Sequence, residues 1–350
     1  FSLTVSTVDG SITSYVYHGR ELLARPLRCN FWRPPTENDL VDIRGARAWE
    51  GLDCLKTEII STTTGEAEVQ ILMALTTPDG NRMRVKQIVV ADEYGCLQLN
   101  YLVMPDGQFR TLPKVGIQFG LDTSLYSSCS FYGNIYETYP DRCEAQRVSR
   151  WYKSMSDLSE PQYVVPEEQG NRTARWVRFQ GDSVSLTAVC PVEQRWLNFS
   201  VHRWNDTVLT AARRWKDVHE EDCYTISIDH RVAPLGTATC GPGVAERYCI
   251  SGDSVYCYSF TLVPGMTDRL YDFPPHSDMY GMPTSTLQAS KAPVARIVSV
   301  PQPSSPYAEG FPQVLSDGHR AICGDWHRGW IGYNGMDTVD LTIMLESPTT

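Results

Sequence analysis

The sequence predicts an all-β fold whose main part is a large antiparallel sandwich, and three observations support this prediction. Short runs of alternating apolar and polar residues recur from Phe1 to about Pro264. Turn sequences rich in Gly, Pro, Asp and Asn separate these runs. Only residues 46–52 and 206–212 have a composition compatible with short helices.

Seven runs show the alternation most clearly, and each predicts one strand because successive side chains of a strand point to opposite faces. In chain order they cover residues 68–75, 85–91, 96–104, 184–189, 196–201, 224–232 and 255–263. Between the first two lies Pro78-Asp79-Gly80, where Gly80 can adopt the positive φ that a tight hairpin requires.

Composition divides the chain into three segments. Residues 1–264 hold the strands described above. Residues 265–295 are rich in Pro, Ser and Met and lack alternation, which predicts a linker or a strap along a surface. Residues 296–350 turn β again and predict a small C-terminal β module.

Bulk properties exclude several classes of partner. The 350 residues are 42% hydrophobic, which is enough for a sizeable core. A net charge of −10 without a basic run argues against a nucleic-acid partner. No apolar run approaches the roughly 20 residues that cross a bilayer, so we expect no membrane partner. The eleven cysteines form no Cys-x-x-Cys pair, so we expect no metal site.

The most specific motifs lie between residues 131 and 179. They are Tyr132-Gly133, Glu137-x-Tyr139-Pro140-Asp141-Arg142 and Pro166-Glu167-x-Gln169-Gly170-Asn171-Arg172-x3-Arg175-Trp176. This pattern resembles the C-terminal sandwich domain of the large β-galactosidases of glycoside hydrolase family two. The resemblance implies that residues 1–264 form a supersandwich of the galactose-mutarotase-like type.

The resemblance also implies an activity for a longer parent protein. Such a parent hydrolyses terminal β-galactosides with retention, through two Glu on a barrel domain that also binds the family's magnesium. This chain would then hold no catalytic residue, metal or cofactor, and would be inactive alone. Its partners would be a carbohydrate and the barrel of the same polypeptide, and a homo-oligomer is compatible with this role.

Both ends of the chain suggest a piece of that parent. The chain opens within strand-like alternation and shows no signal peptide, so we expect sequence before Phe1. Residues 315–347 resemble the first half of a discoidin-type jelly roll, a fold often used to bind carbohydrate, so we expect sequence after Thr350 as well. Because such an appendage is most useful outside the cytoplasm, a periplasmic or secreted parent is favoured.

Residues 30–39 resemble the family's N-F-W-R-A-P-T-D-N-D signature, with Pro34 and Glu37 as departures. The residues of this loop that could shape a sugar pocket are Trp32, Arg33, Asn38 and Asp39. The favoured alternative is structural, because a buried Arg needs a carboxylate partner whatever the function.

A second group of polar residues is interpreted as structural or barrel-docking. Its members are Glu137, Asp141, Arg142, Asn171 and Arg172. A retaining glycosidase does need two carboxyl groups about 5–5.5 Å apart. The resemblance nevertheless places both catalytic acids on the barrel, so these residues are not assigned to catalysis.

Two further positions are candidate sugar contacts. Residues 236–242 resemble the family's G-x-D-x-W-G-P loop, whose Trp stacks on the sugar, but Cys240 stands in its place. A thiol cannot stack on a sugar ring, so ordinary β-galactoside specificity is in doubt, unless another aromatic such as Tyr248 takes the role. In the C-terminal module, Trp326 lies on the turn expected to be exposed.

Three alternatives of other classes stay open. The chain could be a stand-alone carbohydrate-binding module, or a purely structural or oligomerisation domain. Aldose epimerases share the implied fold and use a His/Glu acid–base pair. His202 and His230 lie on predicted strands without a recognisable motif, which favours packed or surface histidines over that chemistry.

Overall fold

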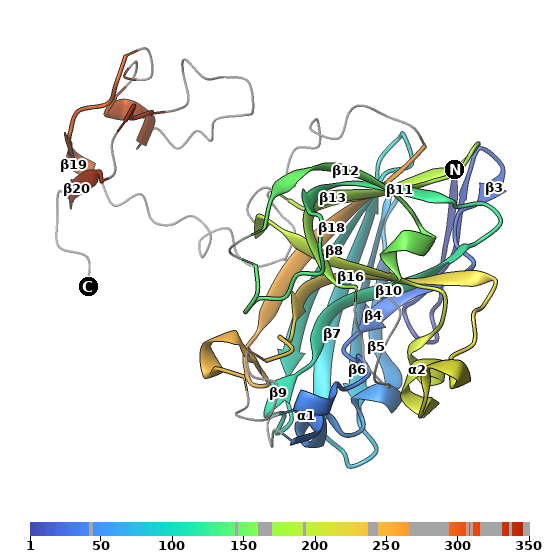
Figure 1. The fold of residues 1–350 in the computed structure, drawn as a ribbon. Coiled ribbons are helices and arrows are strands. Elements are labelled where there is room, and N and C mark those ends of the chain that lie inside the picture. Colours follow the sequence, from blue (N-terminus) through green and yellow to red (C-terminus); the bar gives the residue numbers. More distant parts are fainter. Residues whose placement is uncertain are drawn as a thin grey trace. The chain divides into compact units, whose positions relative to one another are not determined.

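The structure is a computed structural model that describes residues 1–41, 45–143, 146–159, 170–191, 194–236, 244–265, 294–305, 308, 311–315, 331–335 and 338–345. The chain divides into two compact units, Phe1–Ser277 and Asp278–Thr350. The first unit is almost entirely antiparallel sheet (Figure 1). The predicted all-β class is therefore confirmed.

The strands of the first unit fall close to the predicted runs. They are β1 Ser2–Val5, β2 Ile12–Tyr17, β3 Arg20–Glu21, β4 Arg25–Asn30, β5 Lys56–Thr64, β6 Glu68–Thr76, β7 Arg82–Ala91, β8 Leu97–Pro105, β9 Thr111–Leu112, β10 Lys114–Asp122, β11 Ser128–Asn134, β12 Val148–Ser154, β13 Arg172–Gln180, β14 Ser185–Val189, β15 Leu197–His202, β16 Cys223–Val232, β17 Ile250–Ser251 and β18 Tyr256–Pro264. All seven predicted strands are present. Between β6 and β7, Gly80 takes the expected positive φ of +92°.

Helical structure within the described residues is short. The α-helices are α1 Glu37–Val41 and α2 Asp206–Ala211, and the second matches the predicted helical segment. Single 3₁₀ turns occupy Ala46–Trp49, Leu52–Cys54, Ser156–Leu158, Trp215–Asp217, Glu246–Tyr248 and, in the second unit, Gln313–Leu315. No described helix is long and apolar enough to cross a membrane.

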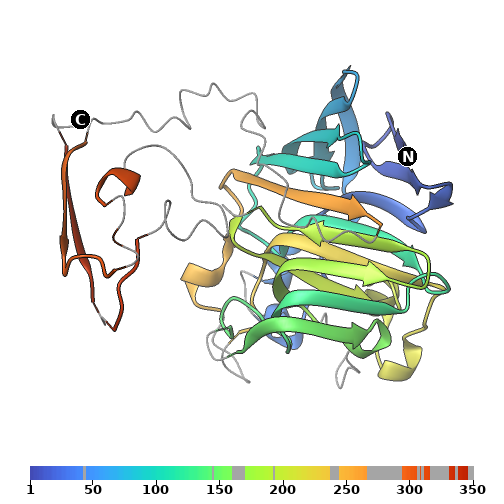
Figure 2. The same ribbon diagram turned by 90° about the horizontal axis from the view of Figure 1, so that it is seen from above.

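One sheet of sixteen strands forms the frame of the first unit. Its order is β1-β2-β4-β10-β16-β15-β13-β14-β18-β8-β7-β6-β5; off this path, β3 pairs with β2, and β11 joins β13 to β12. Figure 2 shows the green to yellow strands of this sheet side by side. The sheet curls so that its two halves face each other. Tyr258 on β18 donates to Gly116 O on β10 at 3.4 Å, and Gln87 on β7 donates to Gly10 O at 2.8 Å.

Aromatic rings fill the space between the two halves. Tyr101 and Tyr258 stack with centroids 5.1 Å apart, and Phe131 meets Phe199 edge-on at 5.2 Å. All four rings are buried. Such pairs add to the hydrophobic gain of burial, so this core fixes the separation of the two halves.

The second unit is described only in part. Its strands β19 Val294–Val300 and β20 Asp340–Leu345 pair antiparallel, from Val294 opposite Leu345 to Val300 opposite Asp340. Ser299 Oγ and Tyr333 Oη lie 2.5 Å apart. These two strands lie almost entirely within the segment 296–350 for which the sequence predicts β structure, whereas the partial jelly roll stays a prediction.

The core predicts a sharp difference between two neighbouring residues of β11. Replacing Phe131 by Ala removes a fully buried ring and should lower the free energy of unfolding by about 3–5 kcal/mol. Tyr132→Ala is the matched control, because this ring is 38% exposed and its loss should cost under about 1 kcal/mol. Urea unfolding of both variants measures the difference, and equal losses would contradict this placement of the core.

Candidate functional site

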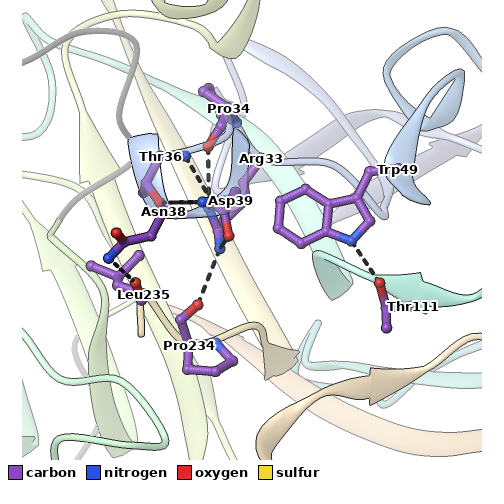
Figure 3. A network of polar contacts seen from close by, with 9 residues as sticks. All are labelled: Arg33, Pro34, Thr36, Asn38, Asp39, Trp49, Thr111, Pro234 and Leu235. Atoms are coloured by element: carbon purple, nitrogen blue, oxygen red, sulfur yellow. Dashed lines mark hydrogen bonds and ion pairs between the residues drawn. The ribbon is translucent and has the colours of Figure 1, made fainter. Parts of the chain in front are cut away.

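The loop that follows β4 folds around a buried ion pair. Arg33 donates from Nη1 to Asp39 Oδ2 at 2.7 Å and from Nη2 to Asp39 Oδ1 at 3.2 Å. Arg33 is 0% exposed and Asp39 is 4% exposed. Two parallel charge-assisted bonds define the relative orientation of both groups, as Figure 3 shows.

The same carboxylate starts helix α1. Thr36 donates to Asp39 Oδ2 from its backbone N–H at 2.7 Å and from its hydroxyl at 2.9 Å. In return, Asp39 N–H donates to Thr36 Oγ1 at 3.3 Å. This reciprocal arrangement is a capping box, which satisfies two backbone donors at a helix start. Asp39 therefore caps the helix and neutralises Arg33 at once.

Packing against Arg33 leaves no room for a ligand. The guanidinium carbon lies 4.9 Å from the ring centroid of Trp49, and Trp49 Nε1 donates to Thr111 Oγ1 at 3.0 Å. A Cβ on Gly45 would stand 2.4 Å from Asp39 O, so only glycine permits this approach. The cavity beside the pair measures about 20 Å³, which is room for about one water molecule. A sugar ring does not fit there.

Three side chains hold three successive carbonyl groups after β16. Arg33 Nη2 donates to Pro234 O at 3.4 Å, and Asn38 Nδ2 donates to Leu235 O at 2.9 Å (Figure 3). Arg142 Nη2 donates to Gly236 O. Gly236 has a φ of +94°, a conformation that strongly favours glycine. The backbone of residues 234–236 is thus held by two segments that are distant in the sequence.

A second network fixes the start of the segment that joins β11 to β12. Arg172 is 3% exposed and donates to Ile135 O at 3.2 Å and to Gly170 O at 2.9 Å. Asn171 is 1% exposed and donates to Thr138 O at 2.5 Å. Both side chains supply donors to backbone carbonyls that would otherwise be buried without partners, which is a structural role.

The two carboxylates of this region differ in their surroundings. Glu137 Oε1 accepts from Gly170 N–H at 3.2 Å. Both carboxylate oxygens of Asp141 are buried, and neither has a hydrogen-bond partner among the described residues. A buried carboxylate without a partner is unfavourable. We therefore expect a hydrogen-bond donor from outside the described residues to bind the Asp141 carboxylate.

The structure brings most of the sequence candidates together. Arg33, Asn38 and Asp39 share one network, and Trp32 beside them packs partly against the core. Arg142 joins this network through residue 236. The burial of Arg33 and Asp39 agrees with the structural alternative for this loop. Cys240 and Trp326 lie outside the described residues.

Several contributing residues had no signal in the sequence. Trp49 and Thr111 support the Arg33 guanidinium although 62 residues separate them, and Pro234 lies 201 residues from Arg33. Gly45 likewise matters only because α1 packs on it. None of these belongs to a motif, because each acquires its role through strand pairing.

The two strand histidines are held neutral. Burial, assisted by the charge of Lys114, lowers the pKa of His202 to about 4. Burial, assisted by Arg231, lowers the pKa of His230 to about 4. Neither ring is hydrogen-bonded to a carboxylate within the described residues. In the same part of the chain, His, Cys, Asp and Glu form no group of three that could hold a metal ion.

The buried ion pair predicts a large loss of stability when it is broken. Arg33→Met leaves Asp39 buried and charged, so the free energy of unfolding should fall by about 3–5 kcal/mol. The matched control is Arg84→Met, because Arg84 and Asp106 form a similar two-bond pair that is 45% and 32% exposed. That exposed pair should contribute about 0–1 kcal/mol. Urea unfolding that gives equal losses would contradict the assignment.

Comparison with known proteins identifies the first unit. A family model described as the β-galactosidase small chain matches residues 1–262. The β-galactosidase of Pseudoalteromonas haloplanktis is 22% identical over 283 residues, covering 76% of this chain and 26% of that protein. The β-galactosidase of Kluyveromyces lactis is 25% identical and covers 68% of this chain and 24% of that protein. β-Galactosidase BgaC of Bifidobacterium adolescentis is 30% identical and covers 51% and 17%.

The chain spans about a quarter of the length of the first two relatives. Among solved structures, a GalM/aldose epimerase homologue from C. elegans matches with a TM-score of 0.37 and 9% identity, covering 75% of this chain and 82% of that one. The family match covers most of the chain and agrees with the motifs between residues 131 and 179. The chain therefore belongs to the β-galactosidase small-chain family.

Proposed function

We propose that this chain is a domain of a longer retaining β-galactosidase and supports the rim of an active site whose catalytic acids lie on another domain. The relatives that it matches are named β-galactosidases and are about four times as long as the matched part. The family resemblance implies a magnesium ion, which we assign to that other domain.

One set of contacts supports the proposed role at the rim of the active site. Arg33, Asn38 and Arg142 donate to the carbonyls of residues 234, 235 and 236 in turn. Residue 236 opens the segment 236–242, whose sequence resembles the family loop that reaches the sugar. Holding three successive carbonyls restrains residues 234–236, where that segment begins, and a restrained attachment point reduces the entropy lost on binding.

The surroundings of Asp141 support docking against another domain. Its carboxylate is buried without a partner among the described residues, directly before Arg142, which binds Gly236 O. A basic or N–H group from a neighbouring domain would complete this carboxylate. The contact would join the rim to the domain that carries the catalytic acids.

The chain alone should have no hydrolase activity. The 350-residue chain should not hydrolyse a chromogenic β-galactoside, because the account places both catalytic carboxyl groups elsewhere. Release of nitrophenol measures this. Turnover that a single substitution within this chain abolishes would contradict the non-catalytic role.

In the longer protein that includes the catalytic domain, loss of the contacts to the carbonyls of residues 235 and 236 should reduce activity. Arg142→Ala and Asn38→Ala should each lower kcat/KM for a chromogenic β-galactoside by about tenfold, which corresponds to the loss of one hydrogen bond of about 1.4 kcal/mol. The effect should appear largely in KM, because the change concerns the position of a binding loop.

Arg25→Ala is the matched control for this experiment. Arg25 lies at the opposite end of β4 from the Arg33 loop, where it pairs with Glu221 at 3.1 Å and donates to Thr225 at 2.7 Å. Its replacement should leave kcat/KM unchanged. Equal effects of all three variants would show that general stability, and not loop position, controls activity.

A further inference from the structure

A hollow of ligand size lies beside strands β13, β15 and β16. It measures about 500 Å³, within the range of roughly 300–1,000 Å³ that is common for ligand pockets. Thr173 on β13, Asn198 on β15 and His230 on β16 line it, together with four residues of the segment that joins β11 to β12, namely Tyr139, Pro140, Cys143 and Gln146.

The wall of the hollow carries polar groups without hydrogen-bond partners among the described residues. Asn134 is 6% exposed, and its side-chain amide makes no hydrogen bond to the described residues. Gln194 Nε2 and His230 Nδ1 are buried and also lack partners there. Buried polar groups are unfavourable unless a ligand or water completes them. This wall offers amide donors and acceptors at several angles.

A β-bulge determines the orientation of one of these groups, the His230 side chain. Gly116 of β10 faces Asp229, and the preceding residue, Val115, faces Arg231, so His230 is the extra residue of a β-bulge. Bulges turn a side chain away from the regular alternation and often occur beside binding sites. The His230 ring stacks on Tyr258 at 5.2 Å with an interplanar angle of 5°, which holds its orientation.

An aromatic ring completes the lining. Trp196, just before β15, is half-buried and lines the hollow. The guanidinium carbon of Arg175 lies 5.0 Å from its ring centroid, and this contact restricts the ring. A flat ring beside amide groups suits a molecule that has an apolar face and hydroxyl groups at its edge.

The charge of the lining indicates a neutral ligand. No Asp or Glu is among the described residues that line the hollow, and its one Arg, Arg231, is exposed. The low pKa of His230, about 4, keeps its imidazole neutral at pH 7 with one donor and one acceptor nitrogen. Without a carboxyl pair, the lining can bind a glycoside but cannot cleave it.

We propose that this hollow is a binding site for one or two neutral sugar rings, which stack on Trp196 and exchange hydrogen bonds with Asn134, Asn198 and His230. Asn198 has its Oδ1 engaged by Asn171 at 3.2 Å and by Thr173 at 3.4 Å. Its amide NH₂ therefore faces a ligand as a donor. The site needs no catalytic domain, so it stands independently of the rim role proposed above.

Calorimetric titration of the 350-residue chain tests the proposal. The probes are methyl β-galactoside, lactose, methyl β-glucoside and cellobiose, with inorganic phosphate as an anionic comparison. At least one neutral saccharide should bind saturably at millimolar concentration, and phosphate should not compete with it. Absence of saccharide binding, or competition by phosphate, would overturn the proposal.

Two variants locate the site. Trp196→Ala should weaken saccharide binding about tenfold through loss of stacking. Asn134→Ala should weaken it about three- to tenfold through loss of one hydrogen bond. Because the Asn134 amide makes no hydrogen bond to the described residues, Asn134→Ala should keep the wild-type melting temperature. This variant therefore tests the site even if Trp196→Ala does not fold.

Trp215→Ala is the matched control. Trp215 lies in the connection between β15 and β16 at the ends of these strands opposite to Trp196, and it is 40% exposed. Its replacement should leave saccharide affinity unchanged. Affinity that falls with Trp215→Ala, or that survives both Trp196→Ala and Asn134→Ala, would place saccharide binding elsewhere and overturn the assignment.

Discussion

The burial of one guanidinium group constrains everything around the candidate site. Arg33 is fully buried, and a buried cation is tolerated only when a carboxylate and further acceptors surround it. Asp39 supplies the carboxylate, and the carbonyls of Pro34 and Pro234 supply acceptors. The loop after β4, the start of α1 and the exit of β16 must therefore come together as one unit, and Asn38 is carried with them to Leu235.

The curled sheet explains why these segments can meet. β10 pairs with β4 on one side and with β16 on the other, so the end of β4 and the end of β16 lie two strands apart. The buried Lys114 at the start of β10 pairs with Asp229 at 3.4 Å, and the bulge next to Asp229 turns His230 toward Tyr258. One irregularity of the ladder thus separates the tightly packed Arg33 network from the roomier hollow.

The sequence predicted the strands well because each run depends on local alternation. It also predicted that a buried Arg33 would need a carboxylate, since both residues lie within one motif. The sequence did not predict the strand order, because the alternation within β10 does not specify β4 and β16 as its neighbours. For the same reason Trp49, Thr111 and the lining residues Asn134 and Trp196 carried no signal, as their roles arise from contacts between distant segments. Cys240 and Trp326, chosen by resemblance, remain predictions.

The central claim is that the Arg33 network sets the direction of the chain leaving β16. Amide hydrogen exchange of the 350-residue chain, compared between the wild type and Arg33→Met, tests this most directly. Exchange should accelerate at residues 233, 235 and 236 by a larger factor than along residues 223–229 of β16 and in β10, because the latter respond only to the loss of global stability. Unchanged exchange at residues 233, 235 and 236, or an acceleration there no larger than in the rest of the sheet, would contradict this claim.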